Sequence, residues 1–416
     1  MEQGSIALMK YLILLGDGIA DYPLEKLGNK TPLEYAHTPN MDRIAGEGTI
    51  GLIDTAAAGL APGSDVANLT VLGYDACKIY SGRGPLEAAN MGVNLGPNDV
   101  AFRCNLITLG SGDHSVMEDF TAGHISSEEA KRIIKDIGKN LGSEEFQFYP
   151  GVSYRHLLVW RNGKESLKTV PPHDITGRTI EEYKPRGEGA DRINQLMKDA
   201  AGLMEDHPVN KERRAAGKKS ANSIWLWGQG KAPKILPITD KYKFRGGMIS
   251  AVDLLNGIGV YAGLEVLRVE GATGYTDTNY EGKANKALEA LTRMDFVFLH
   301  VEAPDEMGHE GNIEGKVLAI EDFDKKVVGT VLGGMDTLNP MRVMVLSDHP
   351  TPVTLMNHAS DPSPFAVLSS IKEENRGSGA FFGEQAALAA GILVSPGHLL
   401  MNIFINNWEN FVEKYR

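Results

Sequence analysis

The segment FVFLHVEAPDEMGH, residues 296–309, decides the fold. Residues 296–301 form an apolar run that is typical of a strand buried on both faces. The run is followed by Asp305 and His309, one helical turn apart, behind a proline that is well placed to start a helix. The pattern predicts a buried strand that delivers a carboxylate and an imidazole to its carboxyl end.

Two other apolar runs end in the same way. Tyr11–Leu15 leads into Asp17, and Val343–Leu346 leads into Asp348 and His349. Parallel strands have their carboxyl ends at one edge of a sheet, where open α/β sheets bind their ligands. The three runs therefore predict a cluster of carboxylates and imidazoles at one sheet edge.

Apolar runs alternate with amphipathic stretches along most of the chain. Leu264–Val269 is a further predicted strand, and Gly315–Leu332 is among the predicted helices. The alternation predicts an α/β fold with a mostly parallel sheet and helices on both faces. Between about Asn98 and Arg178 the apolar runs are shorter and turn signals are frequent, which predicts a smaller inserted domain.

The composition restricts the classes of function. The chain has 416 residues and a net charge of −12, which argues against nucleic acid as its main partner. No apolar run reaches the roughly 20 residues of a membrane span, and residues 1–15 lack the features of a signal peptide. Cys77 and Cys104 are too few for a disulfide framework. We expect a cytoplasmic protein with no membrane partner.

A candidate nucleophile lies in the segment APGSDVAN, residues 61–68. Ser64 follows a tight turn and precedes a helical stretch, where backbone N–H groups favour an anion. A serine here could simply cap the helix, but next to a divalent metal its hydroxyl loses a proton more readily. No Gly-x-Ser-x-Gly motif surrounds Ser64, and Gly311–Lys316 lacks the spacing of a phosphate-binding P-loop.

The candidate ligands indicate more than one metal ion. His358 follows the third apolar run in a loop and adds another imidazole. Carboxylates mixed with imidazoles suit Mn²⁺, Zn²⁺ or related ions, whereas an all-oxygen set favours Mg²⁺ or Ca²⁺. The candidate ligands are Asp17, Ser64, Asp305, His309, Asp348, His349 and His358. This set is too large for one tetrahedral site and indicates two ions.

These residues, in this order, resemble the metal and nucleophile set of the alkaline phosphatase superfamily. The chain is most similar to the 2,3-bisphosphoglycerate-independent phosphoglycerate mutases, in their archaeal-type branch. The resemblance runs over almost the whole chain from Met9. The segments that narrow it to this branch are YSGRGPLEA at 80–88, FTAGHIS at 120–126, PPHDIT at 171–176, SIWLWGQG at 223–230, GATGYTDTN at 271–279 and residues 300–309.

The resemblance implies an architecture. It predicts an alkaline-phosphatase-like domain made of residues 9–95 and 185–416. An inserted α+β lid domain, residues 96–184, would bind the substrate and close over it.

The resemblance also implies a reaction. The enzyme would be an isomerase of glycolysis and gluconeogenesis that interconverts 3-phosphoglycerate and 2-phosphoglycerate through a phosphoserine on Ser64. One metal would be surrounded by Asp17, Ser64, Asp348 and His349, and the other would be held by Asp305, His309 and His358. Mn²⁺ is the expected ion, with Zn²⁺, Mg²⁺ and Co²⁺ as alternatives, and no 2,3-bisphosphoglycerate is required.

A substrate that carries a carboxylate and a phosphate needs cationic and hydrogen-bonding partners. The candidates are Arg155, His156, His173, Asp174, Arg178 and Lys283. Arg155 could instead be an exposed strand residue, and the His-Asp pair at 173–174 a polar turn.

The exact substrate stays open, because the arginine pattern of the bacterial-type mutases does not align with this chain. The alternative is a related metal-dependent phosphotransferase or phosphatase, such as the proposed homoserine kinases or the phosphopentomutases. A silent phosphate-binding regulator would lack a ligand or the nucleophile, and none is missing.

Overall fold

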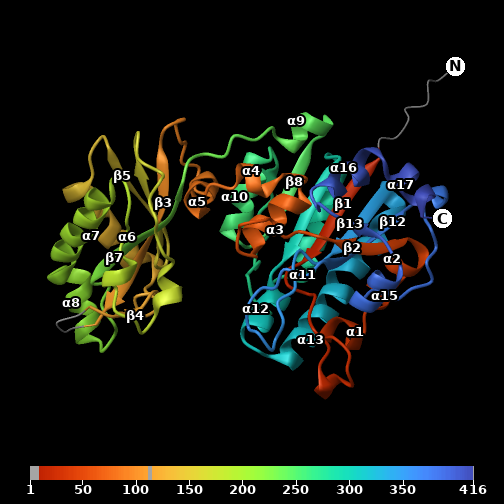
Figure 1. Cartoon of the computed structure of the whole chain (residues 1–416), viewed down its shortest axis with the longest axis horizontal. Coiled ribbons are helices and arrows are strands. Elements are labelled where there is room, and N and C mark those ends of the chain that lie inside the picture. The colour runs from red at the N-terminus through yellow and green to blue at the C-terminus, as the bar shows by residue number, and fades with distance from the viewer. Residues whose placement is uncertain (1–8, 111–114, 416) are drawn as a thin grey trace. The chain divides into compact units, whose positions relative to one another are not determined.

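The computed structural model describes residues 9–110 and 115–415, which form two compact units (Figure 1). Unit 1 comprises Met1–Tyr80 and Ile235–Arg416, and unit 2 comprises Ser81–Lys234. Residues 1–8, on which the signal-peptide argument partly depends, lie outside the described residues. Among the described helices, none is long and apolar enough to cross a membrane.

Unit 1 is built on an eight-stranded sheet with the order β13-β2-β12-β11-β1-β10-β8-β9. The strands are β1 (Lys10–Gly16), β2 (Thr49–Ile53), β8 (Gly246–Ile249), β9 (Glu265–Val266), β10 (Phe296–Val301), β11 (Met341–Leu346), β12 (Ser363–Ser369) and β13 (Leu393–Val394). Every neighbouring pair is parallel except the two that involve β12. The sheet is therefore mostly parallel, as predicted.

Helices cover both faces of this sheet (Figure 1). Along β1, Leu12 and Leu14 join a core cluster with α11 and α13, while Ile13 and Leu15 are also fully buried on the opposite face. The helices of unit 1 are α1 (Pro32–Tyr35), α2 (Pro39–Glu47), α3 (Ser64–Val71), α4 (Ala76–Ile79), α9 (Ile238–Tyr242), α10 (Asp253–Tyr261), α11 (Tyr280–Leu291), α12 (Ala303–His309), α13 (Ile313–Asp322), α14 (Gly329–Gly334), α15 (Glu384–Ala389), α16 (Leu399–Asn406) and α17 (Trp408–Lys414). This arrangement confirms the predicted α/β class.

The three central strands end level with one another. In β1, Gly16 pairs with Val301 of β10, and Leu15 pairs with Leu346 of β11. All three strands are almost completely buried, which explains why they are continuous apolar runs in the sequence. The residues that follow them therefore emerge side by side at one edge of the sheet.

Two sequence predictions differ from the structure in unit 1. The predicted strand Leu264–Val269 is reduced to β9, which spans only Glu265–Val266. The predicted helix Gly315–Leu332 is interrupted between α13 and α14 by a π-helical turn, Phe323–Val328. The buried carboxylate of Asp324 in this turn accepts a 2.7 Å hydrogen bond from Met41 N in the first turn of α2. The helix is interrupted at the residue that makes this tertiary hydrogen bond. The local sequence does not reveal the bond, because Met41 is far away in the chain.

Unit 2 is an α+β unit around an antiparallel five-stranded sheet. The sheet has the order β4-β3-β6-β5, and β7 pairs with the edge of β3 opposite β6. Its elements are α5 (Arg83–Asn90), β3 (Val100–Leu109), β4 (Met117–Asp119), α6 (Ser127–Leu141), β5 (Phe146–Val152), β6 (Arg155–Trp160), α7 (Ala190–Glu205), α8 (Pro208–Ala215) and β7 (Ser223–Gly230). Unit 2 is wider than the predicted insertion, residues 96–184, because α5 packs on β3 and β7 pairs with β3.

Candidate active site

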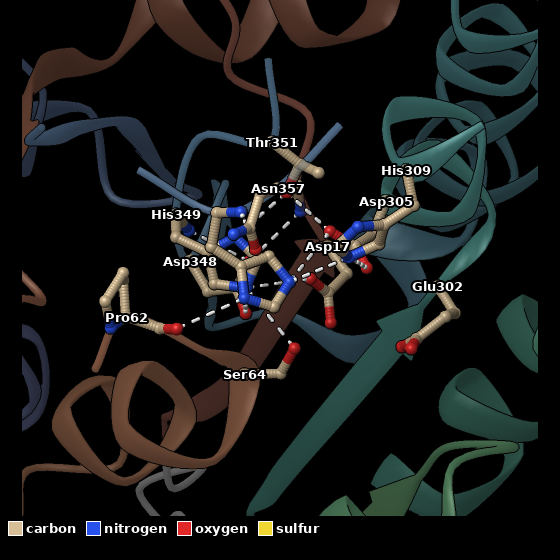
Figure 2. A network of polar contacts seen from close by, with 12 residues as sticks. Asp17, Pro62, Ser64, Glu302, Asp305, His309, Asp348, His349, Thr351 and Asn357 are labelled. Carbon is tan, nitrogen blue, oxygen red and sulfur yellow. Dashed lines mark hydrogen bonds and ion pairs between the residues drawn. The ribbon is translucent and has the colours of Figure 1, made fainter. Parts of the chain in front are cut away.

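The polar residues of the site follow the three central strands of unit 1. Asp17 comes directly after β1, α12 begins two residues after β10, and Asp348 lies in the turn after β11. Figure 2 shows these side chains converging on one region together with Ser64. The structure thus brings together all seven residues that the sequence predicted as metal ligands.

Three residues form what we call the outer group, Asp305, His309 and His358. His309 Nε2 lies 3.2 Å from Asp305 Oδ2, because the two residues are four positions apart on α12. The same nitrogen lies 2.9 Å from His358 Nε2, in the loop after β11. The side chains of His309 and His358 are 34% and 16% exposed.

Three other residues form the inner group, Asp17, Asp348 and His349. His349 Nε2 lies 3.3 Å from Asp17 Oδ1 and 3.5 Å from Asp348 Oδ2. All three side chains are at most 3% exposed. Asp17 Oδ1 is buried and makes no hydrogen bond among the described residues, although His349 lies within ion-pair distance.

The nucleophile candidate lies against the inner group. Ser64 is the first residue of α3, and its Oγ is 3.3 Å from His349 Nε2. Asn68, one turn further along α3, donates 2.8 Å hydrogen bonds to Ser64 O and to Asp348 Oδ2. The two groups also adjoin each other, since the rings of His349 and His358 are 4.3 Å apart.

The electrostatics of the two groups differ. Burial and the nearby carboxylates, Asp348 first among them, raise the pKa of Asp17 well above its usual value. Burial also acts to raise the pKa of Asp305, but hydrogen bonds from His309 and His358 hold it well below the usual value. The hydrogen bond to Asp305 raises the pKa of His309 to about 9.

The donor atoms fit divalent metal ions. In each group the potential ligand atoms lie within 4.8 Å of one another. The outer group offers one carboxylate and two imidazoles, and the inner group offers two carboxylates and one imidazole. Such mixed nitrogen and oxygen sets suit Mn²⁺ or Zn²⁺. The buried, unbonded oxygen of Asp17 is the kind of atom that a cation would satisfy.

A supporting layer behind the inner group was missed by the sequence analysis. His300 Nε2 lies 2.7 Å from Asp17 Oδ2, and Ser250 Oγ lies 3.1 Å from His300 Nδ1. Lys283, predicted to contact substrate, is fully buried and donates a 3.2 Å hydrogen bond to His300 O. Burial lowers the pKa of Lys283 to about 8. The signal for His300 was available, since a polar residue in an otherwise apolar strand is unusual.

The other predicted substrate residues lie in unit 2. His173 contacts the rings of Phe120 and Trp227 at 5.9 and 5.5 Å, and Asp174 lies 3.6 Å from His173 Nε2. Arg155 stacks over Tyr154 with its guanidinium 5.8 Å from the ring centre.

The two remaining candidates of unit 2, Arg178 and His156, have different surroundings. Arg178 is exposed and donates a 3.3 Å hydrogen bond to Tyr183 Oη. His156 is buried and accepts a 3.0 Å hydrogen bond from Gly151 N, and burial lowers its pKa to about 3. The surroundings of His156 are those of a core histidine.

Two further arginines of unit 2 were not predicted from the sequence. The guanidinium carbons of Arg83 and Arg103 lie over the ring of Trp227, 5.9 and 4.8 Å from its centre. Arg103 is 3.4 Å from Glu87, and burial, with the charges of Arg83 and Arg155, acts to lower its pKa. The charges of Arg83 and Arg155 are therefore close enough to Arg103 to disfavour its charged form.

Comparisons with known proteins agree with one another. A family model described as 2,3-bisphosphoglycerate-independent phosphoglycerate mutase matches residues 45–210. A probable 2,3-bisphosphoglycerate-independent phosphoglycerate mutase of Geobacter sulfurreducens is 53% identical over 399 residues, covering 96% of this chain and 100% of that protein. A 2,3-bisphosphoglycerate-independent phosphoglycerate mutase of Methanosarcina barkeri is also 53% identical, covering 94% and 98%. A solved structure of a Pyrococcus horikoshii protein is 31% identical with a TM-score of 0.81, covering 97% and 98%.

Proposed function

This chain belongs to the 2,3-bisphosphoglycerate-independent phosphoglycerate mutase family, and on that premise we propose that it interconverts 3-phosphoglycerate and 2-phosphoglycerate through a phosphoserine on Ser64. One observation carries the proposal: Ser64 Oγ lies 3.3 Å from His349 Nε2, a potential metal ligand of the inner group. A serine held against a metal site is suited to phosphoryl transfer rather than to a structural role.

The two groups are proposed to hold two divalent ions. Asp17, Asp348 and His349, with Ser64, would hold one ion, and the outer group would hold the other. When bound, such ions neutralise phosphoryl oxygens and lower the pKa of a coordinated hydroxyl. Mn²⁺ is the proposed ion on the chemistry of the donors, with Zn²⁺, Mg²⁺ and Co²⁺ as alternatives.

The proposed reaction has two matching transfers. Ser64 Oγ loses its proton and attacks the phosphorus, the bond from phosphorus to the glycerate oxygen breaks, and that oxygen takes up a proton. The other hydroxyl of the retained glycerate then loses its proton and attacks the phosphoserine, which frees Ser64 Oγ to regain a proton. Atoms and charge balance, and no bisphosphoglycerate is consumed.

The substrate carboxylate and phosphate need cations besides the metals. We propose that unit 2 supplies them, as the substrate-binding insertion that the sequence predicted. Arg155 and His173 remain candidates, and Arg103 joins them because its charge is held close to those of Arg83 and Arg155. Guanidinium groups that lie close to one another favour the binding of an anion between them.

The test is turnover of 3-phosphoglycerate with Mn²⁺, without bisphosphoglycerate or nucleotide, on samples quenched with chelator and examined by phosphorus NMR. The expected result is a growing 2-phosphoglycerate signal in the wild type and none for Ser64→Ala. Removal of the metal beforehand should abolish the signal, and added Mn²⁺ should restore it.

Other outcomes decide against the proposal. Release of inorganic phosphate alone would identify a phosphatase, and no change would direct the search to homoserine and sugar phosphates. Turnover by Ser64→Ala would remove the phosphoserine from the reaction while leaving the substrate assignment intact.

A further inference from the structure

The side chain of Thr351 lies between the two ligand groups. Its Oγ1 donates a short hydrogen bond to Asp305 Oδ1 of the outer group and lies 3.2 Å from His349 Nδ1 of the inner group. The residue is fully buried, and Figure 2 shows it above the ligands of both groups. It lies two residues after His349, in the same turn, and it is not one of the predicted ligands.

The space around Thr351 admits little movement. A Cβ added at Gly18 would come within 2.6 Å of both Thr351 Oγ1 and Asp305 Oδ1. A Cβ added at Gly308 would come within 2.5 Å of Thr351 O. Two glycines therefore provide the room in which the threonine fits, and its hydroxyl is fixed in place by packing.

The backbone of Thr351 is held independently of its hydroxyl. Its N–H donates a 3.1 Å hydrogen bond to Ala20 O, and its carbonyl accepts a 2.8 Å hydrogen bond from the buried Nζ of Lys316. Lys316 also pairs with Asp21 at 2.7 Å. A substitution that removes only the hydroxyl should therefore leave the turn in place.

The directions of the two hydrogen bonds follow from the donors available. One hydroxyl carries one proton, and the carboxylate of Asp305 is a stronger acceptor than a neutral imidazole. With that proton donated to Asp305, the oxygen can only accept from His349, so Nδ1 carries the ring proton. His349 Nε2 then keeps its lone pair, and this is the atom that faces Asp17, Asp348 and Ser64.

We propose that Thr351 is a positioning residue that joins the two ligand groups and sets the tautomer of His349 that can bind a metal. The proposal rests on the proposed function, because it assumes that the two groups hold ions. It adds to that function a defined role for a residue that touches neither substrate nor metal. Loss of such a supporting hydrogen bond typically weakens metal binding by about 10–100-fold.

The first test needs no substitution. In metal-free protein labelled with ¹⁵N-histidine, the resonances of His349, assigned with a His349→Gln sample, should show a proton on Nδ1. A proton on Nε2 in the wild type would overturn the proposal, and this result does not depend on whether any Thr351 variant folds.

The second test compares three variants by Mn²⁺ titration, with free Mn²⁺ measured by electron paramagnetic resonance. Thr351→Val should weaken the binding of both ions by about 10–100-fold, and Thr351→Ser should bind within about threefold of the wild type. Thr49→Val is the matched control, because the Thr49 hydroxyl is buried and has no hydrogen-bond partner in the described part of the chain. It should bind Mn²⁺ like the wild type.

The outcomes separate this proposal from the proposed function. A wild type that binds no Mn²⁺ would overturn both the two-metal site and the bridge, the proposed link through Thr351 between the two groups. A wild type that binds two ions, with Thr351→Val binding them equally well, would overturn the bridge alone. Weakening of only the outer ion would show that Thr351 supports Asp305 without joining the groups, and would also overturn the proposal.

Discussion

The inner and outer ligand groups use the same residue types in different surroundings. The inner group is sealed in the protein, whereas the histidines of the outer group reach solvent. Burial and the neighbouring carboxylates raise the pKa of Asp17, whereas hydrogen bonds from two imidazoles hold the pKa of the outer carboxylate, Asp305, below its usual value despite burial. Neighbouring sites can thus differ in how strongly they depend on a cation for their stability.

The inner and outer groups should therefore bind their ions differently. Without an ion, the carboxylates of the inner group are buried close together, which is costly, and burial with the charge of Asp348 raises the pKa of Asp17. The outer group can compensate its own carboxylate with a proton on His309. We therefore expect the inner ion to be bound more tightly and the outer ion to exchange with solvent and with protons.

The largest expected effect concerns the nucleophile. Ser64→Ala should lower mutase activity by at least about 10⁴-fold, because no other group replaces the attacking oxygen. Both ions should still bind, since six ligands remain. The measurement is turnover together with metal content by elemental analysis. Activity within tenfold of the wild type would exclude Ser64 as the nucleophile.

The next largest effect separates the groups directly. His358→Ala should lower the affinity for the outer ion by more than the roughly 100-fold expected from losing a supporting residue. The inner ion should stay bound. Elemental analysis after dialysis should then find one ion per chain in place of two. Two retained ions would show that His358 is not a ligand, and loss of both would show that the groups do not bind independently.

The pH dependence of the outer ion gives a smaller, graded effect. In the metal-free protein the pKa of His309 is raised from 6.5 to about 9, so below pH 9 an ion must displace a proton from this ring. Outer-ion affinity should rise roughly tenfold per pH unit between pH 7 and 9 and then level off.

The control for this profile is His309→Gln, which has no ring proton to displace. It should bind the outer ion weakly and without this rise. A wild-type affinity that is flat from pH 7 to 9 would contradict the assignment of His309 as a ligand.

The smallest expected effect tests the link between the inner group and Ser64. Asn68→Leu removes the hydrogen bonds to Ser64 O and Asp348 Oδ2 and should weaken inner-ion binding and turnover by about tenfold. Asn210→Leu is the matched control, since Asn210 is equally buried but bonds only to backbone groups of unit 2. It should lower thermal stability without changing inner-ion affinity; equal effects of both variants would show that Asn68 acts through stability alone.

The sequence predicted the central sheet, and most candidate ligands could be placed at its edge because they follow its strands closely in the chain. An apolar run followed by Asp348 and His349 indicates both a buried strand and the sheet edge at which these candidate ligands lie. Thr351 and His300 could not be assigned roles in this way. Asp305 lies 46 positions from Thr351, and Asp17 lies 283 positions from His300. Tertiary packing brings such distant residues together.

Unit 2 spans more residues than the predicted insertion, residues 96–184, for a similar reason. Turn signals mark the middle of the unit, but strand β7 joins its sheet by pairing with β3, which lies far from it in the sequence. Arg103 and Arg155 likewise lie close together because β3 pairs with β6, which is also distant from it in the sequence. Local patterns identify elements well and long-range partners poorly.

Because β10, β1 and β11 end level, they bring together residues that are far apart in the chain. This separation bears on the biosynthesis of the protein. The candidate ligands run from Asp17 to His358, so an emerging chain has no complete outer group until residue 358 has been translated. Before then, Asp17 and its neighbouring carboxylates must remain solvated or protonated. Ion capture would thus wait for that point in synthesis, and protein synthesised without Mn²⁺ should be folded in unit 2 yet easily degraded in unit 1.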